Sequence, residues 1–312
     1  MIEVTNLTKA YGETLAVDDL SFTVRPGIVT GFLGPNGAGK STTMRMILGL
    51  DDPTAGTATV DGRPLAEHPL PLHSMGALLE AKAVHPSRPA YDHLRALAVT
   101  NGIGNGRVDE VLDIVGLGDV ARRGSGGFSL GMGQRLGIAG ALLGDPQVVM
   151  LDEPVNGLDP EGIQWIRNLL QDLAREGRTV FVSSHLMSEM ELMAEHYVIV
   201  GRGRLIQDIS ADGLRAMADN NTTRVSADRL HDLVGLLRAD GVTIDSADRG
   251  QVSVTGLDPD EIGVIARDHG IALTSLVPER RSLEAVFMEL TAGAVEYHGH
   301  GTAGSNQAAV AA

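Results

Sequence analysis

The sequence predicts an α/β fold built on a parallel β-sheet, followed by a smaller α+β domain. Three apolar runs without polar alternation, at 28–33, 148–151 and 179–182, predict parallel strands that are buried on both faces. A helical pattern separates the first two runs, and a mixed pattern of strands and helices begins after about residue 220. These observations give the fold class and divide the chain into two domains.

The composition indicates a globular protein without membrane spans or disulfides. Hydrophobic residues make up 43% of the 312 residues and charged residues 21%, which allows one large core and a smaller one. No apolar run approaches the ~20 residues that a membrane helix needs, and the N-terminus has no signal-peptide pattern. Cysteine is absent, which excludes disulfides and thiolate metal sites. The net charge of −15 disfavours nucleic-acid binding and otherwise serves solubility.

The first domain is expected to cover residues 1–218. Short N-terminal strands that pair antiparallel precede the parallel core. A helical insert is expected at about 86–144, with helices over 91–100 and 108–115. The parallel strands on either side of the insert would form one sheet.

The second domain is expected to cover residues 219–292. Its apolar pattern gives the order β-α-β-β-α-β-α, which predicts a small ferredoxin-like sandwich. A regulatory or dimer-stabilising role and a simple packing role are both open for this domain. Residues 293–312 are rich in glycine and alanine and predict a disordered tail.

A phosphate-binding loop follows the first predicted strand. Residues 34–41 match G-x-x-x-x-G-K-[ST] and lead into a helix over 41–48, as a P-loop NTPase requires. Backbone amides and the helix N-terminus would surround the phosphate oxygens of a nucleotide. Lys40 would reach the β- and γ-phosphates, Ser41 would bind Mg²⁺, and Thr42 would bond the α-phosphate. The expected nucleotide contacts here are Gly34, Pro35, Asn36, Gly37, Ala38, Gly39, Lys40, Ser41 and Thr42.

Polar residues also follow the other two predicted parallel strands. Carboxyl ends of parallel strands meet at one edge of a sheet, so these residues should lie near the phosphate loop. Asp152 would hold Mg²⁺, and Glu153 would orient or deprotonate the attacking water. His185 would contact the γ-phosphate. An isolated Asp-Glu is usually a solvated turn and a lone histidine is usually structural, but the phosphate loop favours the catalytic interpretation.

Two further motifs carry a family resemblance. Residues 128–135 (FSLGMGQR) resemble the signature motif, and residues 155–159 (VNGLD) resemble the D-loop, of ATP-binding-cassette (ABC) transporters. Over roughly residues 1–218 the chain resembles the ATP-binding subunit of such a transporter, with His185 as the switch histidine. The resemblance implies an ATPase that uses ATP and Mg²⁺.

The resemblance also assigns residues outside the phosphate loop. Tyr11 takes the place of the aromatic residue that stacks on adenine. In the family, the subunits form a head-to-tail dimer in which each completes the ATP site of the other. Ser129 and Gly131 would therefore contact the γ-phosphate of the partner's ATP, and Asp159 would link the two sites of the homodimer.

Three positions depart from the family pattern. Leu130 replaces the first glycine of L-S-G-G-Q, and Met132 replaces its glutamine. Glu80 stands at the Q-loop glutamine and would offer Mg²⁺ a charged oxygen ligand. These departures resemble the drug-export branch, which includes bacitracin- and daunorubicin-type exporters. Residues 278–291 also resemble the end of such subunits.

The favoured function is the motor subunit of an exporter at the cytoplasmic face of the cell membrane. It would work with separate membrane permease subunits, whose cytoplasmic helix would dock near Glu80 and residues 122–128. The pair Arg122 and Arg123 is either part of that dock or an ordinary solvated pair.

Two other functions are weaker. A soluble ABC ATPase acting on nucleic acid or ribosomes is disfavoured, because the chain has one phosphate loop, no coiled coil between Lys40 and Ser129, and an acidic charge. A P-loop kinase or GTPase would leave the signature stretch unexplained, and the guanine motif N-K-x-D is absent.

Overall fold

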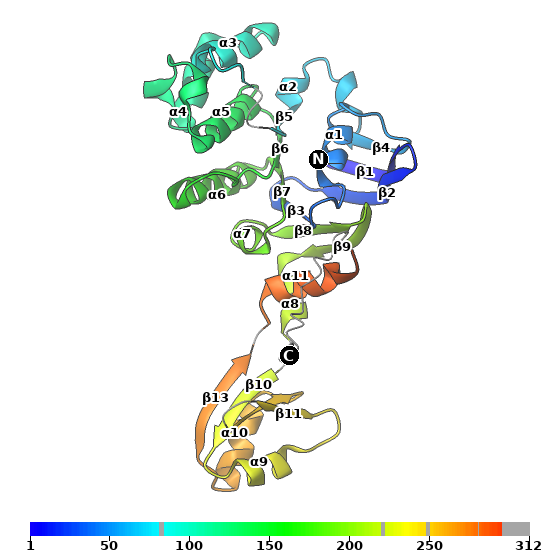
Figure 1. Cartoon of the computed structure of the whole chain (residues 1–312), viewed down its shortest axis with the longest axis vertical. Coiled ribbons are helices and arrows are strands. Elements are labelled where there is room, and N and C mark those ends of the chain that lie inside the picture. Colours follow the sequence, from blue (N-terminus) through cyan, green and yellow to red (C-terminus); the bar gives the residue numbers. More distant parts are fainter. Residues whose placement is uncertain (81–83, 220–221, 248–249, 280, 295–312) are drawn as a thin grey trace, which may run out of the picture.

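The chain forms a large domain and, at one end of the molecule, a smaller domain with a four-stranded sheet (Figure 1). This computed structural model describes residues 1–80, 84–219, 222–247, 250–279 and 281–294. Within these ranges, no helix has both the length and the apolar character to cross a membrane.

A six-stranded sheet forms the centre of the large domain. Its strands are β3 (Val29–Leu33), β5 (Met75–Leu78), β6 (Val148–Asp152), β7 (Thr179–Ser184), β8 (His196–Gly201) and β9 (Arg204–Ser210). They lie in the order β5-β6-β7-β3-β8-β9, and all pairs are parallel except β8 with β9. The three predicted parallel strands are confirmed as β3, β6 and β7. They are direct neighbours, so their carboxyl ends share one edge.

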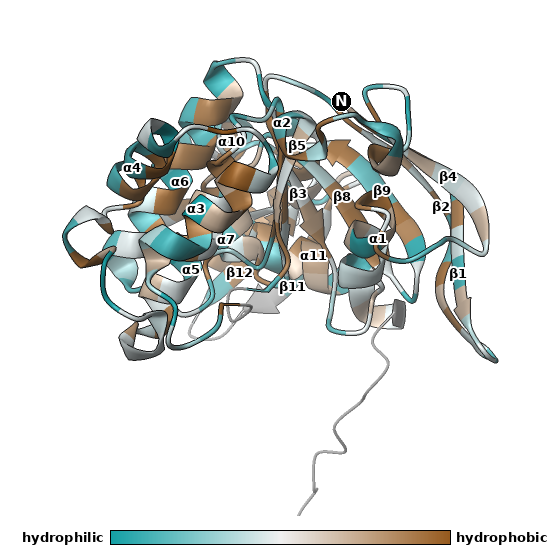
Figure 2. Ribbon diagram, turned by 90° about the horizontal axis from the view of Figure 1, so that it is seen from above, coloured by the Kyte–Doolittle hydropathy of each residue, from teal (hydrophilic) through white to brown (hydrophobic). Residues whose placement is uncertain are grey.

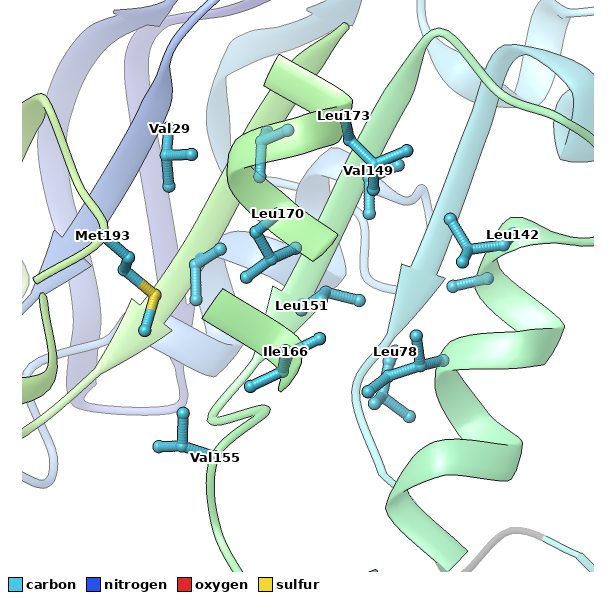
Figure 3. Close-up of a cluster of buried hydrophobic side chains, with 14 of the residues drawn as sticks. Val29, Leu78, Leu142, Val149, Leu151, Val155, Ile166, Leu170, Leu173 and Met193 are labelled. Carbon is cyan, nitrogen blue, oxygen red and sulfur yellow. The ribbon is translucent and has the colours of Figure 1, made fainter. Parts of the chain in front are cut away.

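Two hydrophobic cores cover the two faces of this sheet. On β6, Val149 and Leu151 join one core, whereas Val148 and Met150 join the other. Burial on both faces explains why the strand runs show no polar alternation. Figure 3 shows the first core between the sheet and the helices, and Figure 2 shows strands that are largely hydrophobic beside helices of mixed character.

An antiparallel sheet lies against the second core, as the sequence predicts for the N-terminal strands. It consists of β1 (Ile2–Tyr11), β2 (Thr14–Val24) and β4 (Ala55–Val60), in the order β2-β1-β4. Helix α1 (Lys40–Ile47) contributes Met44 and Ile47 to the same core. Phe22 links the two sheets, because its ring centroid lies 5.5 Å from that of Phe32 and 5.6 Å from that of Phe181.

The helical insert lies between β5 and β6. It contains α3 (Ala90–Thr100), α4 (Asn105–Ile114) and α5 (Leu130–Leu142), with the 3-10 turns η2 (Gly118–Val120) and η3 (Ser125–Gly127). The helices expected over 91–100 and 108–115 are thus present as α3 and α4. The large domain also contains η1 (Leu65–Glu67), α2 (Pro71–Ser74), α6 (Pro160–Arg175), α7 (Met187–Glu191) and α8 (Ala211–Ala218).

The small domain has a separate core. Its elements are β10 (Thr222–Ala227), α9 (Leu230–Leu237), β11 (Thr243–Ala247), β12 (Gln251–Thr255), α10 (Pro259–Asp268) and β13 (Leu273–Glu279). The strands are antiparallel in the order β11-β12-β10-β13. Val225 and Val254 pack with Leu233 of α9 and Ile262 of α10. The element order is that of a ferredoxin-like sandwich.

The last helix corrects the expected domain division. Helix α11 (Leu283–Thr291) belongs to the expected accessory domain over 219–292, but it packs against α7 and α8 of the large domain. Leu283, Val286 and Phe287 are buried in the same core as the parallel sheet. The chain therefore returns to the large domain after β13. A 3-10 turn, η4 (Ala292–Ala294), includes the first two residues of the tail expected over 293–312, and residues 295–312 lie outside the described ranges.

This arrangement predicts different outcomes for two deletions. Thr222 and Glu279 are paired neighbours on β10 and β13, so a short glycine–serine link can replace residues 223–278. That variant should keep the melting temperature and nucleotide affinity of the large domain. Truncation from residue 219 also removes α11, and each buried apolar side chain lost costs about 1.5–3 kcal/mol.

The truncated chain should therefore melt at a clearly lower temperature than the linked variant in thermal unfolding. Equal melting temperatures for the two variants would show that α11 does not stabilise the large domain.

Candidate active site

The phosphate loop joins β3 to α1 and surrounds a small cavity. Gly39 precedes α1 with φ 93°, and a Cβ atom there would lie 2.5 Å from the carbonyl oxygen of Ala16. Only glycine fits that backbone and that approach. The cavity, of about 290 Å³, is lined by Ala16, residues 36–42 and Glu153. Its volume is at the lower end of the range for ligand pockets.

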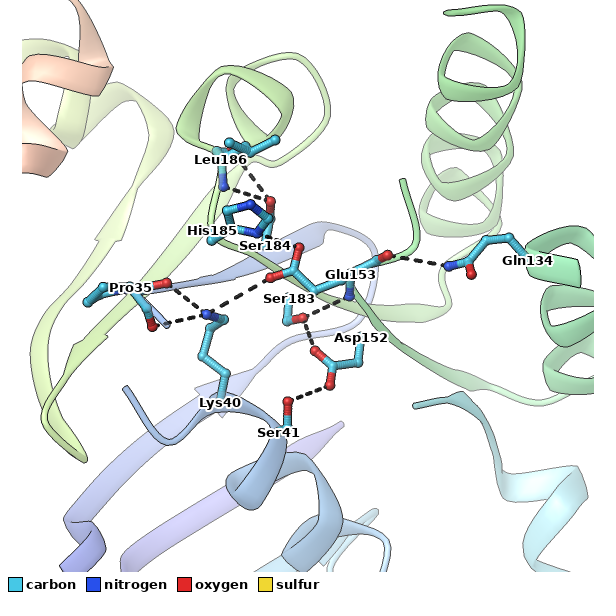
Figure 4. Close-up of polar contacts among 11 residues, drawn as sticks. Pro35, Lys40, Ser41, Gln134, Asp152, Glu153, Ser183, Ser184, His185 and Leu186 are labelled. Atoms are coloured by element: carbon cyan, nitrogen blue, oxygen red, sulfur yellow. Dashed lines mark hydrogen bonds and ion pairs between the residues drawn. The ribbon is translucent and has the colours of Figure 1, made fainter. Parts of the chain in front are cut away.

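Lys40 lies almost buried behind the loop. Its ammonium donates hydrogen bonds to the carbonyl oxygens of Gly34 at 2.7 Å and Pro35 at 3.3 Å (Figure 4). Burial lowers the pKa of Lys40, whereas the nearby charges of Glu153 and Asp152 act in the opposite direction. A buried cation is costly unless an anion accompanies it. The carboxylate of Glu153 lies 4.0 Å away, and phosphate oxygens in the adjoining cavity would add further negative charge.

Asp152 and Ser41 form the pair that fits Mg²⁺. The Ser41 hydroxyl donates to Oδ2 of Asp152 at 2.7 Å, and the Ser183 hydroxyl donates to Oδ1. Hydroxyl and carboxylate oxygens are the ligands that Mg²⁺ prefers. Among the described residues no group of three acidic or histidine side chains is placed to hold a metal, so a bound nucleotide and water would have to supply the other ligands.

Glu80 lies two residues beyond the end of β5, where its side chain is exposed. In the described part of the chain it has no hydrogen bond or ion pair, and the structure does not bring it into contact with Ser41 or Asp152. The next three residues, 81–83, lie outside the described ranges. Strand register places Glu80 at the same sheet edge as Asp152, because Leu78 pairs with Leu151, the residue before Asp152.

Glu153 occupies the centre of the site. The strand β6 ends one residue earlier, and Glu153 has φ 49°, a left-handed conformation that is uncommon outside glycine. Side chains from β7 and α5 hold this backbone by hydrogen bonds. Its amide donates to the Ser183 hydroxyl at 2.9 Å, and its carbonyl accepts from Nε2 of Gln134 at 3.3 Å. Such a conformation costs on the order of 1–3 kcal/mol and persists where surrounding contacts enforce it.

The carboxylate of Glu153 lies between the ammonium of Lys40 and the imidazole ring of His185. Oε1 is 4.0 Å from the ammonium of Lys40, and Oε2 is 2.9 Å from Nδ1 of His185 (Figure 4). His185 comes directly after β7, which is paired with both β6 and β3. The contact uses one ring nitrogen and leaves Nε2 for a ligand. The structure therefore brings together Lys40, Ser41, Asp152, Glu153 and His185, as the sequence predicts from the shared sheet edge.

The signature and D-loop residues lie at two helix starts, away from the phosphate cavity. Ser129 precedes α5, and its hydroxyl accepts from the amide of Met132 at 3.2 Å. Gly131 is in the first turn of that helix. Asp159 precedes α6 and accepts from the amide of Gly162 at 2.9 Å. Ser129 lines a different cavity, of about 450 Å³.

Tyr11 lies at the end of β1 with 49% of its surface exposed. Its hydroxyl donates to Oδ2 of Asp51 at 3.1 Å, and Nζ of Lys9 lies 5.0 Å from the centre of its ring. Desolvation and the hydrogen bond to Asp51 raise the pKa of Tyr11. The exposed ring is accessible for stacking on a flat ligand.

Two residues that hold the site were given no role from the sequence. Ser183 bonds both Asp152 and Glu153, although the sequence shows only a polar residue after an apolar run. Gln134 lies in the signature stretch and is buried, yet its partner is 19 positions away in Glu153. The sequence offers one indication of this role, which is a glutamine among the apolar residues of a helix. Such a side chain needs a hydrogen-bond partner when it is buried.

Comparison with known families and structures shows which family and fold this chain resembles. The family model for ABC transporters matches residues 17–156, and a model for a domain of unknown function matches residues 221–284. The dimeric post-hydrolysis structure of the ATP-binding cassette MJ0796, bound to ADP and Pi, superposes with a TM-score of 0.63 at 25% identity. It covers 68% of this chain and 99% of that one. The predicted cassette fold is thereby confirmed.

Two curated relatives extend the likeness. A bacitracin transport ATP-binding protein from Bacillus licheniformis is 36% identical over 306 residues, which cover 94% of this chain and 98% of the relative. A lantibiotic transport ATP-binding protein from Streptococcus pyogenes is 36% identical over 68% of this chain and 92% of its own length. With near-complete coverage and the phosphate-loop geometry above, the chain belongs to the ATP-binding subunits of ABC transporters.

Proposed function

We propose that this ABC transporter ATPase drives export of an antibiotic, or another hydrophobic or peptide compound, through separate membrane permease subunits. The observation that carries the ATPase role is the Glu153 carboxylate, which lies between Lys40 and His185 beside the Ser41–Asp152 pair. The cargo class is supported by the relatives whose names refer to bacitracin and lantibiotic transport. Export, as the direction, is supported by the departures shared with that branch.

In this proposal the residues of one subunit bind ATP and prepare the water for attack. The phosphate loop amides and Lys40 hold the β- and γ-phosphates, and Tyr11 stacks on adenine. Bound Mg²⁺ would neutralise charge on the phosphates. Glu153 takes a proton from the attacking water, and His185 keeps the carboxylate oriented through Nδ1 while Nε2 faces the γ-phosphate.

Ser41, Asp152 and Glu80 are the proposed ligands of that Mg²⁺. Ser41 and Asp152 are already in hydrogen-bond contact. Glu80 follows β5, the neighbour of β6, and its exposed carboxylate lies at the same sheet edge as Asp152. It would join the metal when a nucleotide is bound.

The second wall of the ATP cavity is proposed to come from another copy of the chain. Ser129 and Gly131 lie outside the phosphate cavity of their own subunit, and both are accessible at the start of α5. In a head-to-tail homodimer they would contact the γ-phosphate of the partner's ATP, with Asp159 between the two sites. The dimer of MJ0796 supports a two-subunit arrangement.

The permease is proposed to dock at the apolar cavity beside the signature motif, which would place the protein at the cytoplasmic face of the membrane. This cavity is lined by Val84, Pro86 and Phe128, close to the region after Glu80. Arg122 stacks on the ring of Tyr91 at 4.2 Å, which supports a packing role for that arginine rather than a direct dock. The transport relatives disfavour the soluble alternative that acts on nucleic acid or ribosomes.

Replacement of Glu153 by Gln should stop hydrolysis while ATP binding persists. Loss of a general base lowers turnover about 10²–10⁴-fold. The variant should accumulate as an ATP-bound dimer, which light scattering after size exclusion would detect alongside a phosphate-release assay. Glu67→Gln, at an exposed carboxylate in η1, is the matched control and should leave turnover unchanged. Near-normal turnover of Glu153→Gln would remove Glu153 from the base role.

Replacement of Lys40 by Ala should instead weaken nucleotide binding itself. The ammonium is nearly buried behind the cavity, so its loss removes the main positive charge facing the phosphates. Charge-assisted hydrogen bonds are worth about 1.5–3 kcal/mol, which corresponds to roughly ten- to a hundredfold in Kd. Fluorescent ATP titration measures this affinity, and an unchanged Kd would contradict the assignment.

Replacement of Glu80 by Gln should raise the Mg²⁺ concentration needed for half-maximal turnover. The substitution keeps the size of the side chain but removes one charged oxygen ligand. Turnover measured over a series of Mg²⁺ concentrations at saturating ATP tests this. An unchanged Mg²⁺ dependence would exclude Glu80 from the metal site.

A further inference from the structure

The first turn of α5 touches the D-loop within the same subunit. A Cβ atom placed on Gly157 would lie 2.2 Å from Cδ2 and 2.4 Å from Cγ of Leu130. The side chain of Leu130 therefore occupies the space that any other residue at position 157 would need. Leu130 is the position where this chain departs from the family glycine, so the contact depends on that departure.

Neighbouring groups make this contact part of a larger one. A Cβ atom on Gly131 would lie 3.2 Å from the carbonyl oxygen of Gly157 and 3.5 Å from Cδ2 of Leu158. Leu158 and Met132 are partly buried against the main core of the large domain. Leu130 and Gly131 of the α5 turn thus lie against Gly157 and Leu158 of the D-loop. Each of the two segments is also packed on the core, through Met132 and Leu158.

Helix α5 also contacts the backbone of Glu153, four residues before Gly157. Leu130 and Gln134 are four residues apart, so their side chains lie on one helix face. Gln134 donates to the carbonyl oxygen of Glu153, while Leu130 covers Gly157. Between these points, the amide of Asn156 donates to the carbonyl oxygen of Glu153 at 3.2 Å. One face of α5 therefore contacts both ends of the segment from Glu153 to Gly157.

We infer that Leu130 is a positioning residue, which couples the signature turn to the D-loop and to the catalytic carboxylate of its own subunit. The inference rests on the proposed function, in which Ser129 and Gly131 serve the partner's ATP and Glu153 serves its own. Movement of the signature turn at one site would displace Gly157 and shift the segment that ends at Glu153 of the other site. Gly157 is the complementary half of the contact, since only a residue without a side chain accepts Leu130.

Substitutions that add a side chain at position 157 and remove one at position 130 test the contact between Leu130 and Gly157. Gly157→Ala should displace Leu130 and reduce ATP turnover by about tenfold, within the range for directly coupled positions. Leu130→Gly alone removes the contact and should lower turnover below that of the wild type. The double variant Leu130→Gly with Gly157→Ala also lacks the contact but removes the collision, so its turnover should rise above that of Gly157→Ala to within about threefold of Leu130→Gly. Gly177→Ala is the matched control for backbone strain, because Gly177 has φ 90° and no atom within 4 Å of an added Cβ. It should retain wild-type turnover.

Two further measurements separate positioning from folding. The ATP affinity of the monomer should be nearly equal for Gly157→Ala and the double variant, because neither substitution alters the phosphate loop. Their melting temperatures should also be similar, which would show that both variants fold. The change should appear in turnover at saturating ATP rather than in the ATP concentration for half-maximal turnover. In the Glu153→Gln background, Gly157→Ala should also reduce the ATP-bound dimer, and Leu130→Gly should restore it.

The results that would overturn the inference are distinct from those that would overturn the proposed function. If the wild type hydrolyses ATP but Gly157→Ala has wild-type turnover, or the double variant is as slow as Gly157→Ala, the coupling through Leu130 is wrong. If the wild type itself does not hydrolyse ATP, the proposed function fails and the inference fails with it.

Discussion

The contacts of the Glu153 carboxylate with the Lys40 ammonium and the His185 imidazole depend on a constraint of parallel sheets. Strands β3, β6 and β7 run side by side, so the three segments that follow them meet at one edge. Lys40 comes from the first, Glu153 from the second and His185 from the third. Burial of each strand on both faces fixes the positions of these segments.

The backbone at Glu153 shows how the site is held. Its left-handed conformation is enforced by Ser183 from the neighbouring strand and by Gln134 from α5. Ser183 also bonds Asp152, so one buried hydroxyl orders both carboxylates. A displacement of the Ser183 hydroxyl would therefore affect the proposed metal pair and the proposed base together.

Helix α5 connects the two halves of the proposed mechanism. Its first turn carries Ser129 and Gly131, which are proposed to serve the partner, and its inner face contacts the segment that includes Glu153. Arg135 of α5 stacks on Trp165 of α6 at 4.4 Å. It also donates to the carbonyl oxygen of Val115 at the end of α4. Helix α5 is thus joined to α4, to α6 and to the segment that follows β6.

The small domain is attached in a way that leaves the large domain complete. Its first and last strands, β10 and β13, are paired neighbours where the chain enters and leaves. Helix α11 then packs against α7, which follows His185 closely. The expected continuous domain over 219–292 was wrong for this helix, because the apolar stripe at 283–290 shows that the helix is buried without showing against which core.

The sequence by itself determined the parallel strands, the phosphate loop and the polar residues that follow the strand ends. These features are local, since an apolar run, a glycine pattern or a carboxylate beside a strand is visible over a few residues. It also predicted the element order of the small domain. The roles of the signature, D-loop and adenine-stacking residues came only with the family resemblance and remain proposals.

Only the tertiary structure decided the contacts between segments far apart in the chain. Gln134 with Glu153, Leu130 with Gly157, and α11 with α7 each depend on packing across elements. No local pattern encodes such pairs, because the same buried glutamine, glycine or apolar stripe fits many partners equally well. The physical reason is that periodicity specifies which face is buried, whereas the three-dimensional arrangement of the elements specifies what that face meets.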